Sequence, residues 1–205
     1  MSQESLDQLV KELASVLPPE ALLRSSEACR PYECDGLTGY RALPAVVALP
    51  DSFAQVQSIL KLCERYRVPL VARGAGTGLS GGATPHPEGV LLSMARFNRI
   101  IAIDPAARTA RVQPGVRNLA ISEAVAEDGL YFAPDPSSQI ACTIGGNVAE
   151  NAGGVHCLKY GLTVHNVIAA QVVLMGGEVL TVGGTAPDAP GYDLLATIIG
   201  SEGML

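Results

Sequence analysis

The stretch from Val68 to Ala83 reads VPLVARGAGTGLSGGA, an apolar run that changes abruptly into a loop with five glycines. The apolar run ends at Leu70-Val71-Ala72 and predicts a buried β-strand. Glycines after a strand allow positive φ angles and let successive backbone N–H groups approach an anion. The stretch therefore predicts a phosphate-binding loop at the end of a strand.

This loop also satisfies the G-x-G-x-x-G pattern over Gly76–Gly81, which is typical of dinucleotide-binding folds. That fold needs a helix at the third glycine and an acidic residue about 20 residues further on. Pro85 and Pro87 exclude the helix. The next apolar run, Val90 to Met94, is followed by Arg96 rather than by an acid. We therefore expect a loop between two strands, which disfavours a nicotinamide-dependent dehydrogenase of the Rossmann type.

The composition is that of a soluble globular chain, with 205 residues of which 48% are hydrophobic and 17% charged. A net charge of -6 without a Lys/Arg cluster disfavours nucleic acid as a partner. The N-terminus lacks a secretory signal and no apolar run reaches the roughly 20 residues that span a bilayer, so a cytoplasmic location is expected. Neither a disulfide framework nor a metal site is predicted, because the histidines are few and scattered and the cysteines are odd in number without a C-x-x-C pair. The cysteines expected to be reduced are Cys29, Cys34, Cys63, Cys142 and Cys157.

Hydrophobic periodicity and breaker residues predict the secondary structure. Helices are expected over Ser5–Leu17, briefly over Glu20–Arg24, from Asp51 or Ser52 through Arg67, over Asn118–Asp128 and over Asp193–Ile199. Strands are expected over Ala45–Leu49, Val68–Ala72 and Val90–Ser93, and hairpins over Ile100–Ile103 with Thr109–Gln113 and over His165–Met175 with Glu178–Val182. The polar segments Pro31–Arg41 and Gly183–Pro190 are expected to be loops. The helix over 118–128 is expected to direct Leu119, Ala120, Ala124 and Val125 inward.

The strand 45–49, the helix after it and the strand that begins at Val68 form a β-α-β unit. Two strands joined by such a crossover are expected to be parallel, with a right-handed connection. The two hairpins predict antiparallel pairing in the second half of the chain.

A second glycine-bearing stretch, Pro134 to Gly154, has too many small residues to fill a core by itself. Thr143 could cap a helical turn that begins with Gly145 and Gly146, leaving backbone N–H groups directed at an anion or a planar polar ring. Small side chains would also let a flat ligand lie against the backbone. Two such loops in one chain predict a large ligand with a diphosphate and an extended ring system.

No residue pattern predicts a nucleophile or a general base. Ser80 lies in G-L-S-G-G rather than in a G-x-S-x-G elbow, and no histidine is placed by the sequence to activate it. Glu150 and Glu202 are interpreted as solvated or ribose-binding acids rather than as bases. If the protein is catalytic, its cofactor carries the chemistry.

With both loops considered together, the chain resembles the FAD-binding domain of the vanillyl-alcohol oxidase and p-cresol methylhydroxylase (PCMH) superfamily. The resemblance runs over Ala45–Leu205 and rests on R-G-A-G-T-G-L-S-G-G, P-D-P-S-S-x-x-x-C-T-I-G-G-N-x-A-x-N-A-G-G, K-Y-G-L-T and G-S-E-G. Within the superfamily, residues 31–37 and 154–161 are similar to the FAD subunits of bacterial glycolate oxidases, a group close to D-lactate and D-2-hydroxyglutarate dehydrogenases.

This resemblance implies that the cofactor is FAD and assigns residues to it. The FAD diphosphate would be wrapped by Arg73, Gly74, Ala75, Gly76, Thr77, Gly78, Leu79 and Ser80. The isoalloxazine and ribityl groups would be lined by Pro134, Asp135, Thr143, Gly145, Gly146, Asn147, Ala149, Asn151 and Gly153, with Glu202 and Gly203 in the final cofactor-binding region. Covalent members carry a histidine at the position of Thr77, so the FAD is expected to be non-covalent here.

The expected fold is α+β, a two-lobed PCMH-type FAD-binding domain with FAD between the lobes. Residues 1–44 are expected to form an N-terminal helical segment and loop. Residues 45–99 would form a first lobe with a parallel β-α-β core, and residues 100–205 a second lobe with antiparallel sheet and helices.

The implied reaction of the parent family is hydride transfer from the α-carbon of a 2-hydroxy acid, glycolate or D-lactate, to the flavin. Family members continue past G-S-E-G-x-L into a cap that supplies substrate-binding residues, so this chain is expected to be truncated and inactive alone. Implied partners are a second flavin-domain subunit and an iron–sulfur subunit, which would place the protein at the inner face of the membrane. Two alternatives remain: a non-catalytic FAD-binding or subunit-assembly fragment, and a reductase of nucleotide-sugar enolpyruvyl groups that shares the fold but not the 134–154 motif.

Overall fold

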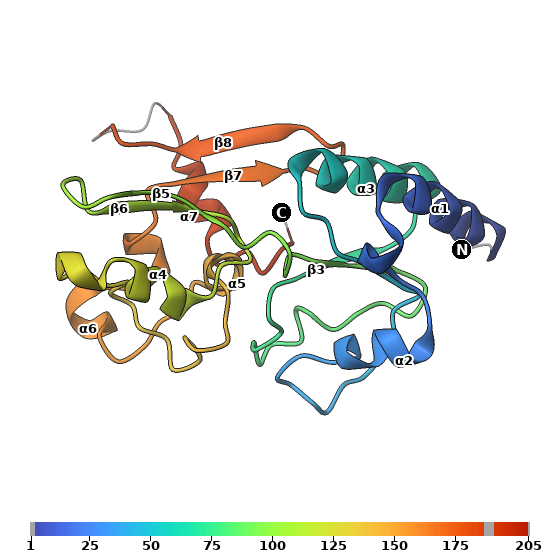
Figure 1. The fold of residues 1–205 in the computed structure, drawn as a ribbon, viewed down its shortest axis with the longest axis horizontal. Helices are drawn as coiled ribbons and strands as arrows, with labels where there is room; N and C mark the ends of the chain where they lie inside the picture. Colours follow the sequence, from blue (N-terminus) through green and yellow to red (C-terminus); the bar gives the residue numbers. More distant parts are fainter. Residues whose placement is uncertain (1–2, 187–190, 205) are drawn as a thin grey trace. The chain divides into compact units, whose positions relative to one another are not determined.

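The computed structural model of the protein describes residues 3–186 and 191–204 (Figure 1). The end of the predicted loop 183–190, from residue 187, and the terminal residue 205 lie outside the described residues. The chain forms two compact units, the first made of Met1–Arg96 with Val173–Leu180 and the second of Phe97–Val172 with Thr181–Leu205.

The first unit is built on a four-stranded sheet in the order β1-β2-β4-β3. Its strands are β1 (Leu22–Leu23), β2 (Val46–Ala48), β3 (Leu70–Arg73) and β4 (Val90–Ser93). Both β2 and β3 run parallel to β4, with Val47 and Val71 opposite Leu91. The prediction of parallel strands joined by a helix is therefore confirmed, and β4 lies between the two.

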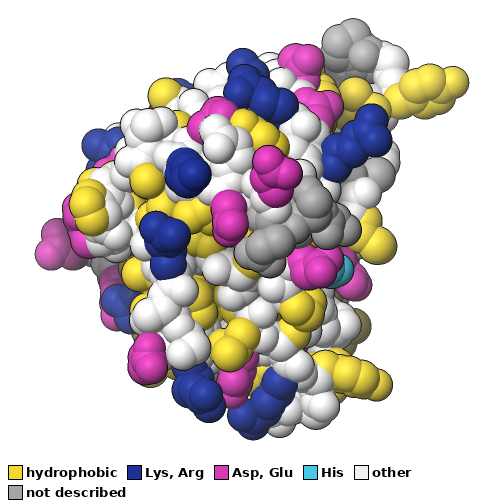
Figure 2. Space-filling model, turned by 90° about the vertical axis from the view of Figure 1, so that its right-hand side faces the viewer, with side chains coloured by type: hydrophobic (Ala, Val, Ile, Leu, Met, Phe, Trp, Pro, Cys, Tyr) yellow, Lys and Arg dark blue, Asp and Glu magenta, His cyan; other side chains and the backbone are white. Residues whose placement is uncertain are grey.

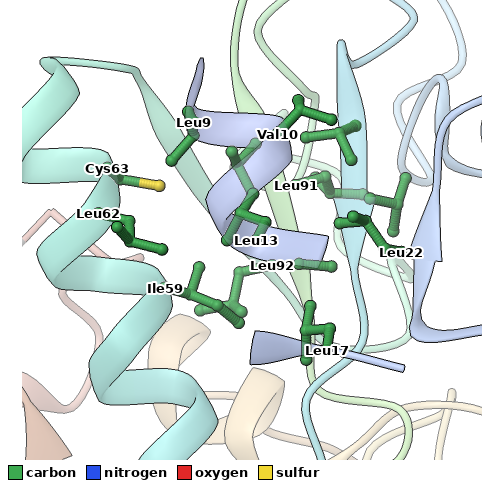
Figure 3. Packing of buried hydrophobic residues seen from close by; sticks show 14 of the residues in the cluster. Leu9, Val10, Leu13, Leu17, Leu22, Ile59, Leu62, Cys63, Leu91 and Leu92 are labelled. Atoms are coloured by element: carbon green, nitrogen blue, oxygen red, sulfur yellow. The ribbon is translucent and has the colours of Figure 1, made fainter. Parts of the chain in front are cut away.

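Two helices pack their apolar faces into one core with this sheet. These are α1 (Gln3–Val16) and α3 (Phe53–Tyr66), which confirm the two predicted amphipathic helices. Figure 3 shows Leu13 of α1 and Ile59 of α3 directed toward each other, with Leu91 of β4 beside them. All three side chains are fully buried, and each such burial contributes roughly 1.5–3 kcal/mol. An ion pair between Arg65 and Glu12 also joins the two helices, at 3.0 Å.

The prediction of a short helix over Glu20–Arg24 is wrong. Only one 3₁₀ turn forms, at Pro19–Ala21, and Leu22 and Leu23 then pair antiparallel with β2. The open edge of β2 offers hydrogen bonds, and Leu22 becomes buried there. Tertiary pairing has overridden the local pattern. The segment after it contains α2 (Ser26–Cys29) and a 3₁₀ turn at Arg30–Tyr32, followed by the expected loop.

The second unit consists mainly of short helices and two hairpins. Its elements are β5 (Ile100–Asp104), β6 (Thr109–Val112), α4 (Asn118–Ala124), α5 (Ile144–Glu150), α6 (Cys157–Tyr160), β7 (Ala169–Val173), β8 (Val179–Gly183) and α7 (Leu194–Ile198). The turn between β7 and β8, with the adjoining strand ends, is part of the first unit. Strands β5 and β6 pair antiparallel, as predicted, and β7 and β8 form the second hairpin. The parallel and antiparallel sheets confirm the α+β class.

Two elements of the second unit differ from the prediction. Helix α4 ends at Ala124 and continues as a 3₁₀ turn, so Ala124 is exposed and Ile121, which was not predicted, is buried. Strand β7 begins only at Ala169, because a 3₁₀ turn occupies Thr163–His165. The buried residues form two small clusters, Val116, Ile121 and Ile144 in one, and Val182, Leu195 and Ile199 in the other.

The surface carries both signs of charge. On the face shown in Figure 2, Lys and Arg side chains are interspersed with Asp and Glu side chains. All five cysteines are free thiols. Among the described residues, no helix combines the length and the apolar character that crossing a membrane would require.

Candidate functional site

The glycine-rich loop occupies residues 74–89, between β3 and β4, and none of these residues is helical. The predicted strand–loop–strand arrangement is thereby confirmed. Gly76 and Gly81 have φ angles of 72° and 81°, a region that side chains disfavour. A Cβ on Gly81 would meet only ordinary contacts, at 3.7 and 3.9 Å, so the backbone there has open space beside it. The loop contains the predicted residues Gly74, Ala75, Gly76, Thr77, Gly78, Leu79 and Ser80.

Arg73, the last residue of β3, lies buried beneath this loop rather than on its outer surface. Its Nη1 donates to the carbonyl oxygen of Cys34 at 2.8 Å and to that of Ala83 at 3.4 Å. Its guanidinium also lies over the ring of Tyr32, 5.6 Å from the centroid. Burial lowers the pKa of Arg73, and the nearby charge of Asp35 opposes that shift. The positive charge is therefore held under the loop by the chain itself.

The segment 32–37, for which periodicity predicted only a loop, packs against the glycine-rich loop. A Cβ on Gly36 would lie 2.7 Å from the carbonyl oxygen of Gly78 and 3.0 Å from that of Thr77. Glycine is thus required by close backbone packing rather than by a turn. The adjacent Asp35-Gly36 pair was a turn signal in the sequence, but nothing local indicated which distant backbone it would contact.

In the second unit, the turn at Pro134-Asp135 is tightly enclosed. Pro134 is buried, and Asp135 has a left-handed backbone with a φ of 48°. Gly154 packs against the backbone of both residues so closely that a Cβ would collide with the carbonyl oxygen of Asp135. The carboxylate of Asp135 accepts a hydrogen bond from Gln139 and lies 3.3 Å from Nδ1 of His156.

Aromatic side chains surround His156 on the same side of this turn. Tyr131 and Tyr160 contact its ring edge-to-face, with centroid distances of 5.8 and 6.4 Å. The hydrogen bond from Lys159 lowers the pKa of Tyr160, and the Lys159 ammonium lies 4.9 Å from the ring centroid of Tyr160. Sequence reasoning assigned no role to these residues.

Thr143 occupies the N-cap position of α5, as predicted, but its side chain makes no capping hydrogen bond. Its Oγ1 is buried and has no hydrogen-bond partner in the part of the chain that the structure describes. The amides of Ile144 and Gly145 donate to Val116 and Pro114, so the helix start does not present the row of free N–H groups that the sequence suggested. Gly145 is also required sterically, since its Cβ would lie 2.7 Å from Pro114.

Asn147 is turned into the interior of the second unit. Its Oδ1 accepts a hydrogen bond from Nδ2 of Asn118 at 2.7 Å, and its Nδ2 donates to Sγ of Cys142 at 3.3 Å. Asn118 and Asn147 are 0% and 3% exposed. Asn118 was predicted only as the start of a helix, and an asparagine at that position gives no signal of a buried partner 29 residues away.

Gly146 lies in the first turn of α5, where a Cβ would be 3.5 Å from Oγ1 of Thr143. The other predicted residues lie near the end of α5. Asn151 has a left-handed backbone, and its Oδ1 accepts from the amide of Val164 at 3.0 Å. The amide of Glu202 donates to the carbonyl oxygen of Ala149 at 2.8 Å, which places the G-S-E-G turn against α5. Gly153 packs against Leu162, and a Cβ on Gly203 would have open space.

These features fit a flavin dinucleotide. The first unit supplies a loop with two positive-φ glycines above a buried guanidinium, which suits a diphosphate. The second unit supplies the buried hydroxyl of Thr143, which has no hydrogen-bond partner among the described residues. A bound ligand could provide that partner.

A family model described as "FAD binding domain" matches residues 44–183. The chain belongs to the FAD-binding domain family. The matched region contains both glycine-bearing loops, whereas segment 32–37 and the turn with Glu202 lie outside it.

Curated relatives agree with this FAD-binding domain assignment. Glycolate oxidase subunit GlcD of Escherichia coli K12 is 64% identical over 189 residues, which cover 92% of this chain and 38% of that protein. GlcD of Bacillus subtilis is 42% identical over 196 residues, 95% of this chain and 42% of that protein. A D-lactate dehydrogenase of Archaeoglobus fulgidus is 39% identical over 202 residues, 98% of this chain and 44% of that protein. The chain thus spans less than half the length of these relatives.

Solved structures share the fold of this FAD-binding domain. Alkyldihydroxyacetonephosphate synthase superposes with a TM-score of 0.85 at 24% identity, over 97% of this chain and 38% of that one. p-Cresol methylhydroxylase with substrate bound superposes with a TM-score of 0.77 at 24% identity, over 97% of this chain and 41% of that one. The predicted PCMH-type fold is confirmed.

Proposed function

We propose that this chain is the FAD-binding part of a flavin-dependent 2-hydroxy acid dehydrogenase of the glycolate oxidase type. The observation that carries the proposal is 64% identity to glycolate oxidase subunit GlcD over 92% of the chain. Resemblance to D-lactate dehydrogenases supports the wider substrate class, glycolate or D-lactate.

One FAD would use both loops. The backbone of residues 74–80 would hold the diphosphate, with the buried charge of Arg73 below it. The residues of the second unit proposed to line the isoalloxazine and ribityl groups are Pro134, Asp135, Thr143, Gly145, Gly146, Asn147, Ala149, Asn151 and Gly153, with Glu202 and Gly203 nearby. Thr143 supports this assignment through its hydroxyl, whereas the side-chain amide of Asn147 is engaged by Asn118 and Cys142. FAD, when bound, supplies the acceptor for a hydride from the substrate α-carbon.

The cofactor would be held without a covalent bond at Thr77. The Thr77 side chain is exposed on the loop, and a hydroxyl offers no nucleophile comparable to an imidazole. Denaturing the loaded protein should therefore release all of its flavin into the soluble fraction. Flavin that stays with the precipitated chain would contradict this part of the proposal.

Substrate binding and turnover would require residues that the longer relatives possess outside the matched region. The relative GlcD is a subunit of glycolate oxidase, which supports assembly of this chain with other subunits. We propose that these are a second flavin-domain subunit and an iron–sulfur subunit, and that the assembly works in the cytoplasm at the inner face of the membrane.

Titration with FAD tests the proposal. The purified 205-residue chain should quench FAD fluorescence with saturable binding, and a chain that stays colourless at high FAD would overturn the cofactor assignment. The full-length protein loaded with FAD should then bleach on addition of glycolate or D-lactate under anaerobic conditions. If the 205-residue chain binds FAD and does not bleach, it acts as the alternative, a cofactor-binding or assembly fragment, which its span of 38% of GlcD favours.

A further inference from the structure

A buried carboxylate beside the glycine-rich loop has no hydrogen-bond donor for one of its oxygens. Asp35 is 5% exposed, and its Oδ1 accepts from the amide of Leu37 at 2.8 Å. Its Oδ2 is closed to solvent and has no hydrogen-bond partner within residues 3–186 and 191–204. A buried ionised oxygen is costly unless a positive charge compensates it.

That compensating charge is available in Arg73. Arg73 is 8% exposed, and Asp35 is the charged group that most strongly opposes the effect of burial on it. Nη1 of Arg73 donates to the carbonyl oxygen of Cys34, the residue next to Asp35, which places the guanidinium near that carboxylate, although the two side chains form no ion pair within 4.0 Å. Their attraction therefore acts through a medium from which water is largely excluded, where it is strengthened.

Direct contact between Asp35 and a cofactor is not the role that this geometry supports. Oδ1 of Asp35 is occupied by the amide of Leu37, and the charge of Asp35 acts on Arg73, which is itself buried. The position of Arg73, in contrast, decides the shape of the loop. Its guanidinium fills the space beneath Gly76, and its hydrogen bonds join the segment before β2 to the middle of the loop at Ala83.

We infer that Asp35 is a positioning residue, whose negative charge holds the guanidinium of Arg73 beneath residues 74–84 and so orders the loop. The effect on the loop follows from the structure alone, while its consequence for FAD rests on the proposed function. Segment 32–37 is then part of the cofactor site although it precedes the first strand that the family model matches.

Two substitutions separate the charge from the turn. Asp35→Asn keeps an oxygen for the amide of Leu37 and removes the charge, whereas Asp35→Ala removes both. Asp51→Asn is the matched control, because Asp51 is exposed and is not among the charged groups that act on Arg73. In the cofactor-free chain, hydrogen exchange of the amides in residues 74–84 should become about tenfold faster in Asp35→Asn and stay unchanged in Asp51→Asn.

The decisive variant removes both charges. Asp35→Asn combined with Arg73→Met also removes the guanidinium that the charge positions, so exchange in the loop should be no faster than in Arg73→Met alone. Slow exchange in Asp35→Asn with fast exchange in Asp35→Ala would overturn the inference, because Asp35 would then act only through the turn. Effects that simply add in the double variant would overturn it as well. If Asp35→Asn does not fold, recovery of folding in the double variant supports the inference and continued failure contradicts it.

FAD binding gives the second readout. Where the proposed function holds, Asp35→Asn should weaken FAD binding about tenfold or more and leave riboflavin, which lacks the diphosphate, unaffected. If the wild-type chain binds no FAD yet its loop exchange responds as described, the proposed function fails and the positioning role stands. If FAD binds and loop exchange does not respond, the positioning role fails and the proposed function stands.

Discussion

Gly76 and Arg73 are packed so closely that no side-chain atom fits between them. A Cβ built on Gly76 would overlap the guanidinium, which is itself held by the carbonyl oxygens of Cys34 and Ala83. Gly76 also has a φ of 72°. The glycine is therefore required twice, once by its backbone conformation and once by the buried arginine below it.

Replacing this glycine should disrupt the proposed diphosphate site. Gly76→Val is expected to weaken FAD binding by at least about tenfold and to lower the free energy of unfolding by about 1–2 kcal/mol from the backbone conformation alone. Fluorescence titration and urea unfolding measure the two effects. Gly39→Val is the matched control, because a Cβ at Gly39 would meet nothing within 4 Å. Unchanged FAD affinity in Gly76→Val would show that the diphosphate binds elsewhere.

The buried hydroxyl of Thr143 should matter more to the ligand than to the fold. Thr143→Val removes a hydroxyl that has no protein partner, so the free energy of unfolding of the cofactor-free chain should stay the same or rise by about 1 kcal/mol. FAD affinity should fall, by about tenfold for one lost hydrogen bond. Thr163→Val is the control, because Oγ1 of Thr163 donates to the carbonyl oxygen of Ala152 at 2.7 Å and its loss should destabilise the chain. A Thr143→Val protein with weaker folding and normal FAD affinity would refute the ligand role.

Asn118 should contribute strongly to the stability of the second unit. Asn118→Ala leaves the buried Oδ1 of Asn147 with only the weak thiol donor of Cys142 at 3.7 Å, and such a loss costs about 1–3 kcal/mol. Urea unfolding measures this loss, and Asn98→Ala, at an exposed asparagine, should change stability by no more than about 0.5 kcal/mol. Equal stability in the two variants would mean that water replaces the lost amide.

Alkaline pH should destabilise the chain through Cys63. Burial raises the pKa of this thiol to about 12, whereas the pKa of a cysteine thiol in an unfolded chain is about 8.5. Above that lower value the unfolded chain loses a proton that the folded chain keeps, so the free energy of unfolding should fall by about 1.4 kcal/mol per pH unit. Below about pH 8.5 the Cys63 thiol is protonated in both states, and its full contribution to the free energy of unfolding is present.

Unfolding measured between pH 7 and pH 10 checks this expectation. Cys63→Ala should flatten the decline above about pH 8.5, although its cavity lowers stability at every pH. Cys34→Ala, at a half-buried thiol, is the control. An unaltered slope in Cys63→Ala would assign the alkaline instability to other groups.

Much of the fold could be predicted from local pattern. Helices α1 and α3 carry their buried leucines and isoleucine at helical spacing, and turn residues mark the hairpins. Pro85 and Pro87 were enough to exclude a helix after the glycines, which the structure confirms. The failures came where a short segment had a distant partner, as at Leu22-Leu23, because local propensity does not record which strand edge is free.

The sequence by itself determined where the chain could bend, where it could expose its backbone and which faces had to be buried, since each depends on the residue and its near neighbours. It thus indicated both loops and the family they belong to. Only the tertiary structure decided that β4 lies between β2 and β3, that Gly36 packs on Gly78, and that Asn118 pairs with Asn147. Such contacts join residues far apart in the chain, and their geometry is selected by packing and by the need to satisfy buried polar groups, which no local pattern encodes.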